Sequence, residues 1–127
     1  MGGCTVGSEE LFRVWWDESA RVSRTEWAPG AVCGLAEAQG STAASQALGH
    51  GAVPVLVDMR QMSKIDRAAR EHFTNAPGDV SAVALLVGSA VSKMIANFMI
   101  GMKRMPFPVR MFTDESAALE WLDDNRG

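Results

Sequence analysis

The sequence has few cysteines and histidines, and this shortage excludes several kinds of site. The 127-residue chain has two cysteines, Cys4 and Cys33, too few for a disulfide framework. Neither cysteine shares a metal-ligand spacing with His50 or His72, so we expect no structural zinc site. Both thiols are expected to be reduced and inert, and the sequence predicts no metal and no cofactor.

Membrane and secretory features are missing as well. No apolar run approaches the roughly 20 residues that cross a bilayer, so we expect no transmembrane helix. The amino terminus has no basic region followed by an apolar stretch, which a secretory signal requires. Val6 stands where a myristoylation motif beginning at Gly2 would need serine or threonine. These absences predict a cytoplasmic protein.

The charge is small but unevenly distributed. The net charge is −3, yet residues 60–110 hold eight of the 12 lysines and arginines and only three of the 15 acids. This segment either forms a basic face that attracts anions or disperses its charges over several faces on folding. An acidic chain without a ribbon of aromatic and basic residues predicts no nucleic-acid partner.

The first half of the chain predicts a tail, a hairpin and a helix. Residues 1–10 lack periodicity and are expected to form a flexible tail. Residues 11–16 and 20–27 are rich in β-formers and flank a short polar turn, as in a β-hairpin. In the second strand we expect one face to meet water. The alanine-rich residues 33–49 predict a helix.

The second half alternates strands and helices. The nearly continuous apolar runs 53–59, 80–87 and 109–112 predict strands that are buried on both faces. Helices are expected after each strand, with Asp66, Ser89 and the segment 113–115 at their starts. Parallel strands joined by right-handed helical crossovers satisfy this order. We therefore predict a single α/β domain over residues 11–124, with a mixed sheet of four or five strands.

The helix expected at residues 90–105 carries a long apolar stripe, which we expect to pack on the sheet. The stripe consists of Val91, Met94, Ile95, Phe98, Met99, Met102 and Met105. Ile100 lies almost opposite, beside Lys93 and Arg104 on the helical wheel. A large aliphatic side chain on a basic face predicts contact with a second subunit, a lipid surface or an apolar ligand.

The carboxyl edge of the predicted sheet is the candidate ligand site, because ligands of parallel sheets bind there. Asp58, Arg60 and Ser89 fall at this edge, where free N–H groups at helix starts favour an anion. Arg67 and Lys93 would add positive charge. Alternatively, Asp58 pairs with an arginine, and Asp66 and Ser89 only cap helices. No motif predicts catalytic residues or a nucleotide-binding phosphate loop.

Five segments resemble a small bacterial group of proteins. They are Pro54–Arg60, Ile65–Arg70, Val83–Ser89, Phe107–Asp114 and Ala118–Leu122. The group is similar to the STAS domain of sulfate transporters and anti-sigma-factor antagonists, and the likeness covers residues 10–124. It implies a sheet flanked by helices in a small cytosolic protein that often pairs with itself.

The resemblance also concerns a phosphorylation switch. In the wider STAS family, an Asp-Ser pair starts the helix after the central strand, and the serine is phosphorylated. Asp66 matches that aspartate, whereas Arg67 replaces the serine. A guanidinium cannot accept a phosphoryl group, so we expect no switching through this position.

Two functions follow as hypotheses. The first is a non-enzymatic, STAS-like regulatory or protein-interaction module, expected to be a homodimer and to bind a protein partner. The second is a carrier or sensor of a small anionic or lipidic molecule. The expected ligand- or partner-binding residues are Asp58, Arg60, Asp66, Arg67, Arg70, Ser89, Lys93 and Ile100.

Overall fold

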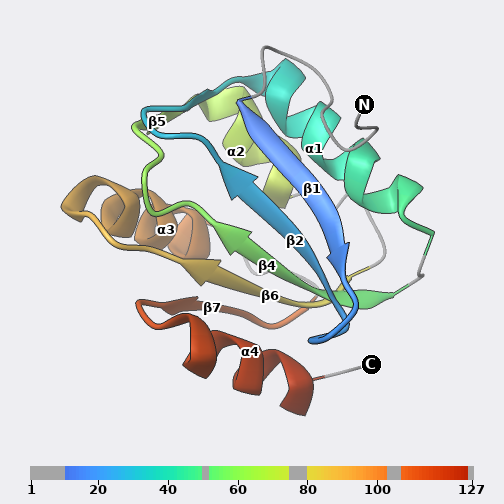
Figure 1. Cartoon of the computed structure of the whole chain (residues 1–127). Coiled ribbons are helices and arrows are strands. Elements are labelled where there is room, and N and C mark those ends of the chain that lie inside the picture. The colour runs from blue at the N-terminus through green and yellow to red at the C-terminus, as the bar shows by residue number, and fades with distance from the viewer. Residues whose placement is uncertain (1–10, 50–51, 75–79, 103–106, 126–127) are drawn as a thin grey trace.

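The computed structural model describes residues 11–49, 52–74, 80–102 and 107–125. The elements in these ranges follow one another along the chain as strands and helices (Figure 1). In chain order they are β1 (Phe12–Asp17), β2 (Val22–Trp27), β3 (Val32–Cys33), α1 (Leu35–Ala47), β4 (Val53–Asp58), β5 (Lys64–Ile65), α2 (Arg67–Thr74), β6 (Val80–Leu86), α3 (Ala90–Met102), β7 (Val109–Phe112) and α4 (Glu115–Asp124). The predicted tail, residues 1–10, lies outside the described residues.

Five strands form one mixed sheet in the order β1-β2-β4-β6-β7. The hairpin strand β1 runs antiparallel to β2, and every other neighbouring pair is parallel. In register, Val55 of β4 lies opposite Val83 of β6, which lies opposite Val109 of β7. This arrangement confirms the predicted α/β class, the mixed sheet and the shared direction of the three apolar strands.

Helices cover both faces of the sheet (Figure 1). Helices α1, α2 and α3 pack on one face with Phe12, Leu85 and Met99, while α4 packs on the other with Leu56 and Leu86. Strand β6 contributes to both cores because its successive side chains point to opposite faces. The unbroken apolar composition of β4 and β6 follows from this burial on two sides.

The β-hairpin has a tight turn that is organised by Asp17. Its carboxylate accepts a hydrogen bond from the Ala20 backbone N–H at 3.0 Å and pairs with Arg24 at 2.8 Å. The Ala20 hydrogen bond, together with Arg24, lowers the pKa of Asp17 despite an opposing effect of burial. The non-glycine residue Arg21 closes the turn with φ 58°. A specific polar network therefore fixes the β1–β2 register.

Strand β2 differs from the sequence-based expectation. One face was expected to meet water, but Ser23 and Thr25 are buried, as are Val22 and Trp27. The hydroxyl of Ser23 lies 3.0 Å from that of Ser45 in α1. This partner, 22 positions away in sequence, allows a polar residue to be buried there.

A small second sheet was not predicted. Strand β3 pairs in parallel with β5, and each strand has two residues. Alternation cannot be recognised in so short a segment. Because Val32 and Cys33 belong to this sheet, α1 begins at Leu35 and not at residue 33. The small sheet ties the start of α1 to the loop that precedes α2.

Three helix starts were predicted to be capped, and they differ in the structure. Asp114 accepts a hydrogen bond from the Ala117 N–H at 2.9 Å, and Ser89 accepts one from Ser92 N–H at 3.0 Å. Asp66 precedes α2, and its carbonyl oxygen accepts from Arg70 N–H. Among the described residues, its carboxylate has no hydrogen bond to the helix.

The two aspartates therefore make a matched pair for a stability experiment. We expect Asp114→Ala to lower the free energy of unfolding by about 1 kcal/mol, because a side-chain cap is lost. Asp66→Ala should lower it by less than half as much. Urea unfolding followed by circular dichroism measures both variants, and equal losses would contradict the assignment of the caps.

Candidate functional site

The carboxyl ends of β4, β6 and β7 meet at one rim, as the sequence predicted. The Met59 N–H donates to the Leu86 carbonyl at 3.0 Å, and the Val87 N–H donates to the Phe112 carbonyl at 2.8 Å. Asp58, Arg60 and Ser89 therefore occupy the same edge of the sheet. The question for function is whether their polar groups are free to bind a ligand.

Asp58 and Arg60 bind each other. The guanidinium donates from Nε and Nη2 to the two carboxylate oxygens of Asp58, at 3.0 and 2.7 Å. This hydrogen bonding raises the pKa of Arg60. The arginine stem lies over Gly88, where an added Cβ would sit 3.1 Å from Arg60 Cγ. The pair therefore matches the alternative in which Asp58 engages an arginine.

The start of α3 is closed by a serine that the sequence-based reasoning missed. The fully buried Ser92 hydroxyl oxygen accepts from the Gly88 N–H at 3.1 Å and from the Ser89 N–H at 3.0 Å. Ser89 in turn caps Ser92, so the two serines act reciprocally. Their spacing is that of a capping box with serine in place of the acid, and this pattern was the available signal. Both backbone donors are engaged within the protein.

The other predicted residues lie on or directly before α2 and on α3, two helices that pack against each other. Arg67 is 82% exposed and pairs with Glu71 one turn later, at 3.2 Å. The Arg70 guanidinium lies 4.4 Å from the centre of the Phe98 ring, a cation–π contact between the two helices. Asp66 directly precedes α2, and its carboxylate lies near the backbone of Gly34.

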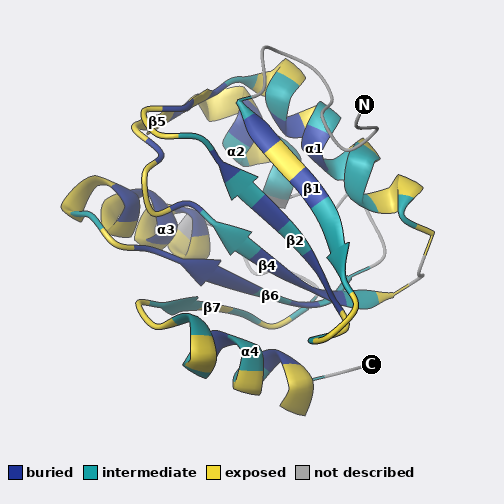
Figure 2. Cartoon of the chain, viewed as in Figure 1, coloured by how far each residue is buried: buried dark blue, intermediate teal, exposed yellow. Residues whose placement is uncertain are grey.

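The prediction that the whole apolar stripe of α3 packs on the sheet is wrong. Ile95 and Met99 are buried, but Val91, Met94 and Phe98 are 41%, 64% and 51% exposed. The stripe spans too wide an arc for one contact, and α3 packs beside β7, at the margin of the sheet. Figure 2 shows exposed residues along this helix. The predicted members Met102 and Met105, and Arg104 on the opposite side, have side chains outside the described residues.

The eight predicted residues thus form two groups. Asp58, Arg60 and Ser89 lie at the rim, whereas the others lie directly before α2 or on α2 and α3: Asp66, Arg67, Arg70, Lys93 and Ile100. Lys93 is exposed, and Ile100 is 37% exposed. Their role in binding stays a prediction. In the part of the chain that the structure describes, no group of three or more His, Cys, Asp or Glu residues could hold a metal ion.

The cations of residues 60–110 engage different partners. Arg60 binds Asp58, and Arg67 binds Glu71. Arg110 stacks 5.3 Å from the centre of the Phe112 ring on β7, the edge strand. These arginines are thus used on separate elements, as in the alternative of dispersed charge. None of the helices described here is long and apolar enough to span a membrane.

Comparison with protein families identifies the chain. The model of the family described as Domain of unknown function (DUF7793) matches residues 17–126. The chain belongs to this family. No curated protein shows significant similarity to it.

Comparison with solved structures supports the fold. A protein from Shewanella loihica PV-4, described as an uncharacterised DUF3478 protein with a SpoIIAA-like fold, superposes with a TM-score of 0.59. It is 13% identical, and the match covers 87% of this chain and 91% of that one. A protein of unknown function from Arthrobacter sp. FB24 is 29% identical, with coverage of 92% and 95% and a TM-score of 0.32. The first match confirms the STAS-like fold.

Of the two cysteines, Cys33 lies within the part of the chain that the structure describes. Its environment makes it a poor nucleophile. The residue is fully buried, and burial, followed by the charges of Glu37 and Asp66, raises the pKa of its thiol to about 12. At pH 8 about one thiol in ten thousand would then be ionised. Because the thiolate is the reactive form, the structure gives Cys33 no nucleophilic role.

We therefore expect iodoacetamide at pH 8 to leave Cys33 unmodified in the folded protein and to modify it in 6 M guanidinium chloride. Peptide mapping by mass spectrometry distinguishes Cys33 from Cys4. Rapid modification of Cys33 under native conditions would show that this thiol is accessible and ionised, contrary to the structure.

Proposed function

We propose that this chain is a non-enzymatic, STAS-like docking module that pairs with a second copy of itself through the outer surface of α3. One observation supports the proposal above all. Val91, Met94 and Phe98 form an exposed apolar row at spacings of three and four residues, so they share one side of the helix. We call these three residues the α3 row.

The neighbours of the α3 row fit a helix–helix contact. Ala90, Asn97 and Gly101 follow the row along its solvent side, and none of them is charged, while Arg70 of α2 stacks on Phe98 at the other edge of the row. A Cβ added at Gly101 would meet nothing within 4 Å, so the backbone there is open to close approach. Depletion of charge and enrichment in methionine and aromatic residues are typical of the centre of an interface.

A second copy satisfies this surface because the α3 row can pair with itself. In an antiparallel arrangement about a two-fold axis, Val91 of one copy would face Phe98 of the other, with both Met94 side chains near the axis. Such isologous contacts are the commonest in homo-oligomers. Burial would gain about 25 cal/mol for each square ångström of apolar surface removed from water.

The rim of the sheet supports a non-catalytic role. Asp58 and Arg60 neutralise each other, while Ser89 and Ser92 use their hydroxyls in a reciprocal cap. Arg67, which stands where the resemblance to the STAS domain places a phosphorylated serine, lies on the surface with Glu71. The proposed docking is therefore independent of phosphorylation at this position. Because these polar groups bind one another, the rim gives little support to the alternative function, a carrier of an anion.

The proposal predicts that a charge within the α3 row will break the dimer. Met94 is 64% exposed, so Met94→Glu should leave the fold intact. It would place two carboxylates near the axis, and we expect the dimer dissociation constant to rise at least about tenfold, a change of 1.4 kcal/mol. Sedimentation equilibrium over a wide range of concentrations measures this constant.

Ile100→Glu is the matched control, since Ile100 lies on the opposite side of α3. It should leave association unchanged. A wild-type protein that remains monomeric at high concentration would refute the dimer. Dissociation by Ile100→Glu and not by Met94→Glu would instead favour the Ile100 face that the sequence suggested.

A further inference from the structure

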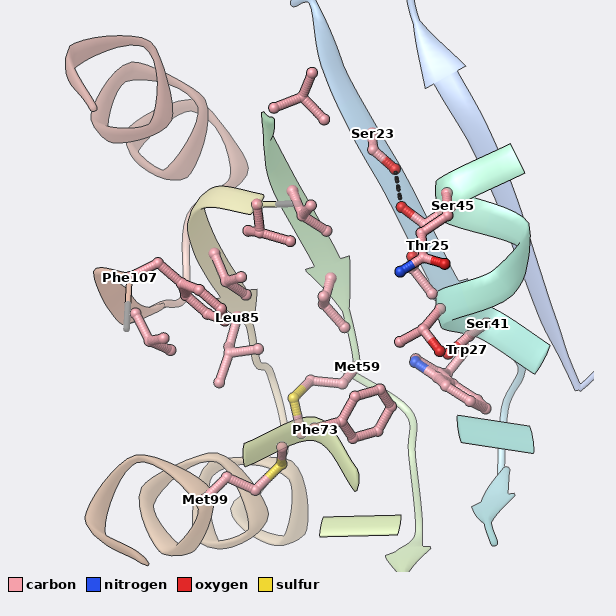
Figure 3. A pocket seen from close by; sticks show the side chains of 18 of the residues that line it. Ser23, Thr25, Trp27, Ser41, Ser45, Met59, Phe73, Leu85, Met99 and Phe107 are labelled. Carbon is pink, nitrogen blue, oxygen red and sulfur yellow. Dashed lines mark hydrogen bonds between the residues drawn. The ribbon is translucent and has the colours of Figure 1, made fainter. Parts of the chain in front are cut away.

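A cavity of about 190 Å³ lies between the sheet and helices α1, α2 and α3. Two chemically different walls line it (Figure 3). The apolar wall includes Met59, Phe73, Leu85, Met99 and Phe107, and the hydroxyl-bearing wall includes Ser23, Thr25, Ser41 and Ser45. Phe73 and Met99 come from α2 and α3, whereas Ser41 and Ser45 come from α1.

The cavity exists because short side chains face each other across the α1–β2 contact. Gly40 brings α1 close to β1, since an added Cβ would sit 3.2 Å from Phe12 Cζ. Five residues further along α1, the Ser45 hydroxyl lies 3.0 Å from that of Ser23 of β2, and both short side chains line the cavity. Thr42 and His72, 3.0 Å apart, hold α1 beside α2. The helix is thus fixed in position while the volume beneath it stays unfilled.

The cavity lies on the sheet face that α1, α2 and α3 cover, and none of the eight predicted binding residues lines it. Its lining reaches Val53, Val80 and Val109, the first residues of β4, β6 and β7. These residues mark the amino ends of the parallel strands, whereas Met59 and Met62 extend the lining to the carboxyl edge. A ligand held here would not use the predicted anion site.

The lining specifies a neutral ligand. The described residues that line the cavity include no aspartate, glutamate, lysine, arginine or histidine. An ion would lose its hydration without gaining a charged partner. In the Ser23–Ser45 contact one hydroxyl donates to the other, and the accepting hydroxyl keeps its own proton for a further bond. A carbonyl or hydroxyl oxygen of a ligand could accept that proton.

We propose that this cavity binds a small neutral amphiphile, whose hydrocarbon part lies against the apolar wall and whose single hydroxyl or carbonyl group bonds to Ser23 or Ser45. The size is suitable, since an apolar cavity of about 150 Å³ takes up benzene. A compound with one or two rings, or a chain of about eight carbons, is of the expected class. This binding does not depend on dimer formation.

Octan-1-ol is the probe, and methionine methyl groups report where it binds. Met59, Met62 and Met99 line the cavity, whereas Met94 lies on the exposed α3 row. In protein labelled with ¹³C at the methionine methyls, we expect octan-1-ol to shift the signals of the three lining residues saturably. The Met94 signal should stay in place. Octanoate at pH 8, with a chain of equal length and a negative charge, should bind at least tenfold more weakly.

Two variants test the opposite walls. Ser23→Ala/Ser45→Leu fills the cavity from α1 without leaving a lone buried hydroxyl, and Val83→Phe fills it from β6. Each should weaken octan-1-ol binding at least tenfold. Ala43→Leu is the matched control, because it adds a similar side chain to an exposed position of α1. It should bind octan-1-ol like the wild type.

The polar contact has its own test. Ser23→Ala/Ser45→Ala removes both hydroxyls and keeps the space, so octan-1-ol should bind several-fold more weakly while toluene binds unchanged. Absence of saturable shifts at Met59, Met62 and Met99 up to the solubility limit of octan-1-ol would overturn the proposal. Equal affinity for octanoate would overturn the neutral specificity. Met94→Glu should still bind octan-1-ol, which separates this proposal from that of the dimer.

Discussion

The burial of β4 and β6 between two layers of helices is the constraint on which the rest of the structure depends. Both strands are apolar on two faces, so the sheet is stable only with α4 on one side and α1–α3 on the other. Parallel pairing then brings Asp58 and Ser89 to one rim and places α3 at the margin beside β7. This layering therefore sets the positions of the α3 row and of the cavity, the two features with a proposed function.

Helices α1 and α3 cover the same face of the sheet but differ in how well their side chains fill the space against it. Helix α1 presents small and hydroxylated side chains and leaves a cavity under Ser41 and Ser45. Helix α3 has the opposite property, with more apolar side chains than the sheet can cover, so Met94 and Phe98 remain outside. Underfilling within one layer and excess apolar surface at its margin are independent features. One favours a small ligand, and the other favours a second copy of the chain.

Sequence patterns predicted the five strands of the main sheet and the four described helices, because long apolar runs and their order carry that information. The STAS-like fold was predicted from the resemblance of five segments to a known family. Three features were missed for physical reasons. Strands β3 and β5 are too short to show a period, and the contact between Ser23 and Ser45 joins distant positions. The apolar stripe of α3 is so broad that the sequence does not reveal which of its residues pack on the sheet. At the candidate site, residues 58–60 were found, but Ser92 was overlooked, although its spacing from Ser89 is that of a capping box.

The central claim is that the helices over the sheet leave a cavity that can hold a small ligand. A crystal structure of the protein grown with octan-1-ol would test this claim most directly. The account predicts parallel β4, β6 and β7, with elongated density between the Ser45 hydroxyl and Leu85. In crystals grown without the alcohol, the helices should keep the same positions. Closure of this space by Met59 and Phe73 in both crystals would contradict the account.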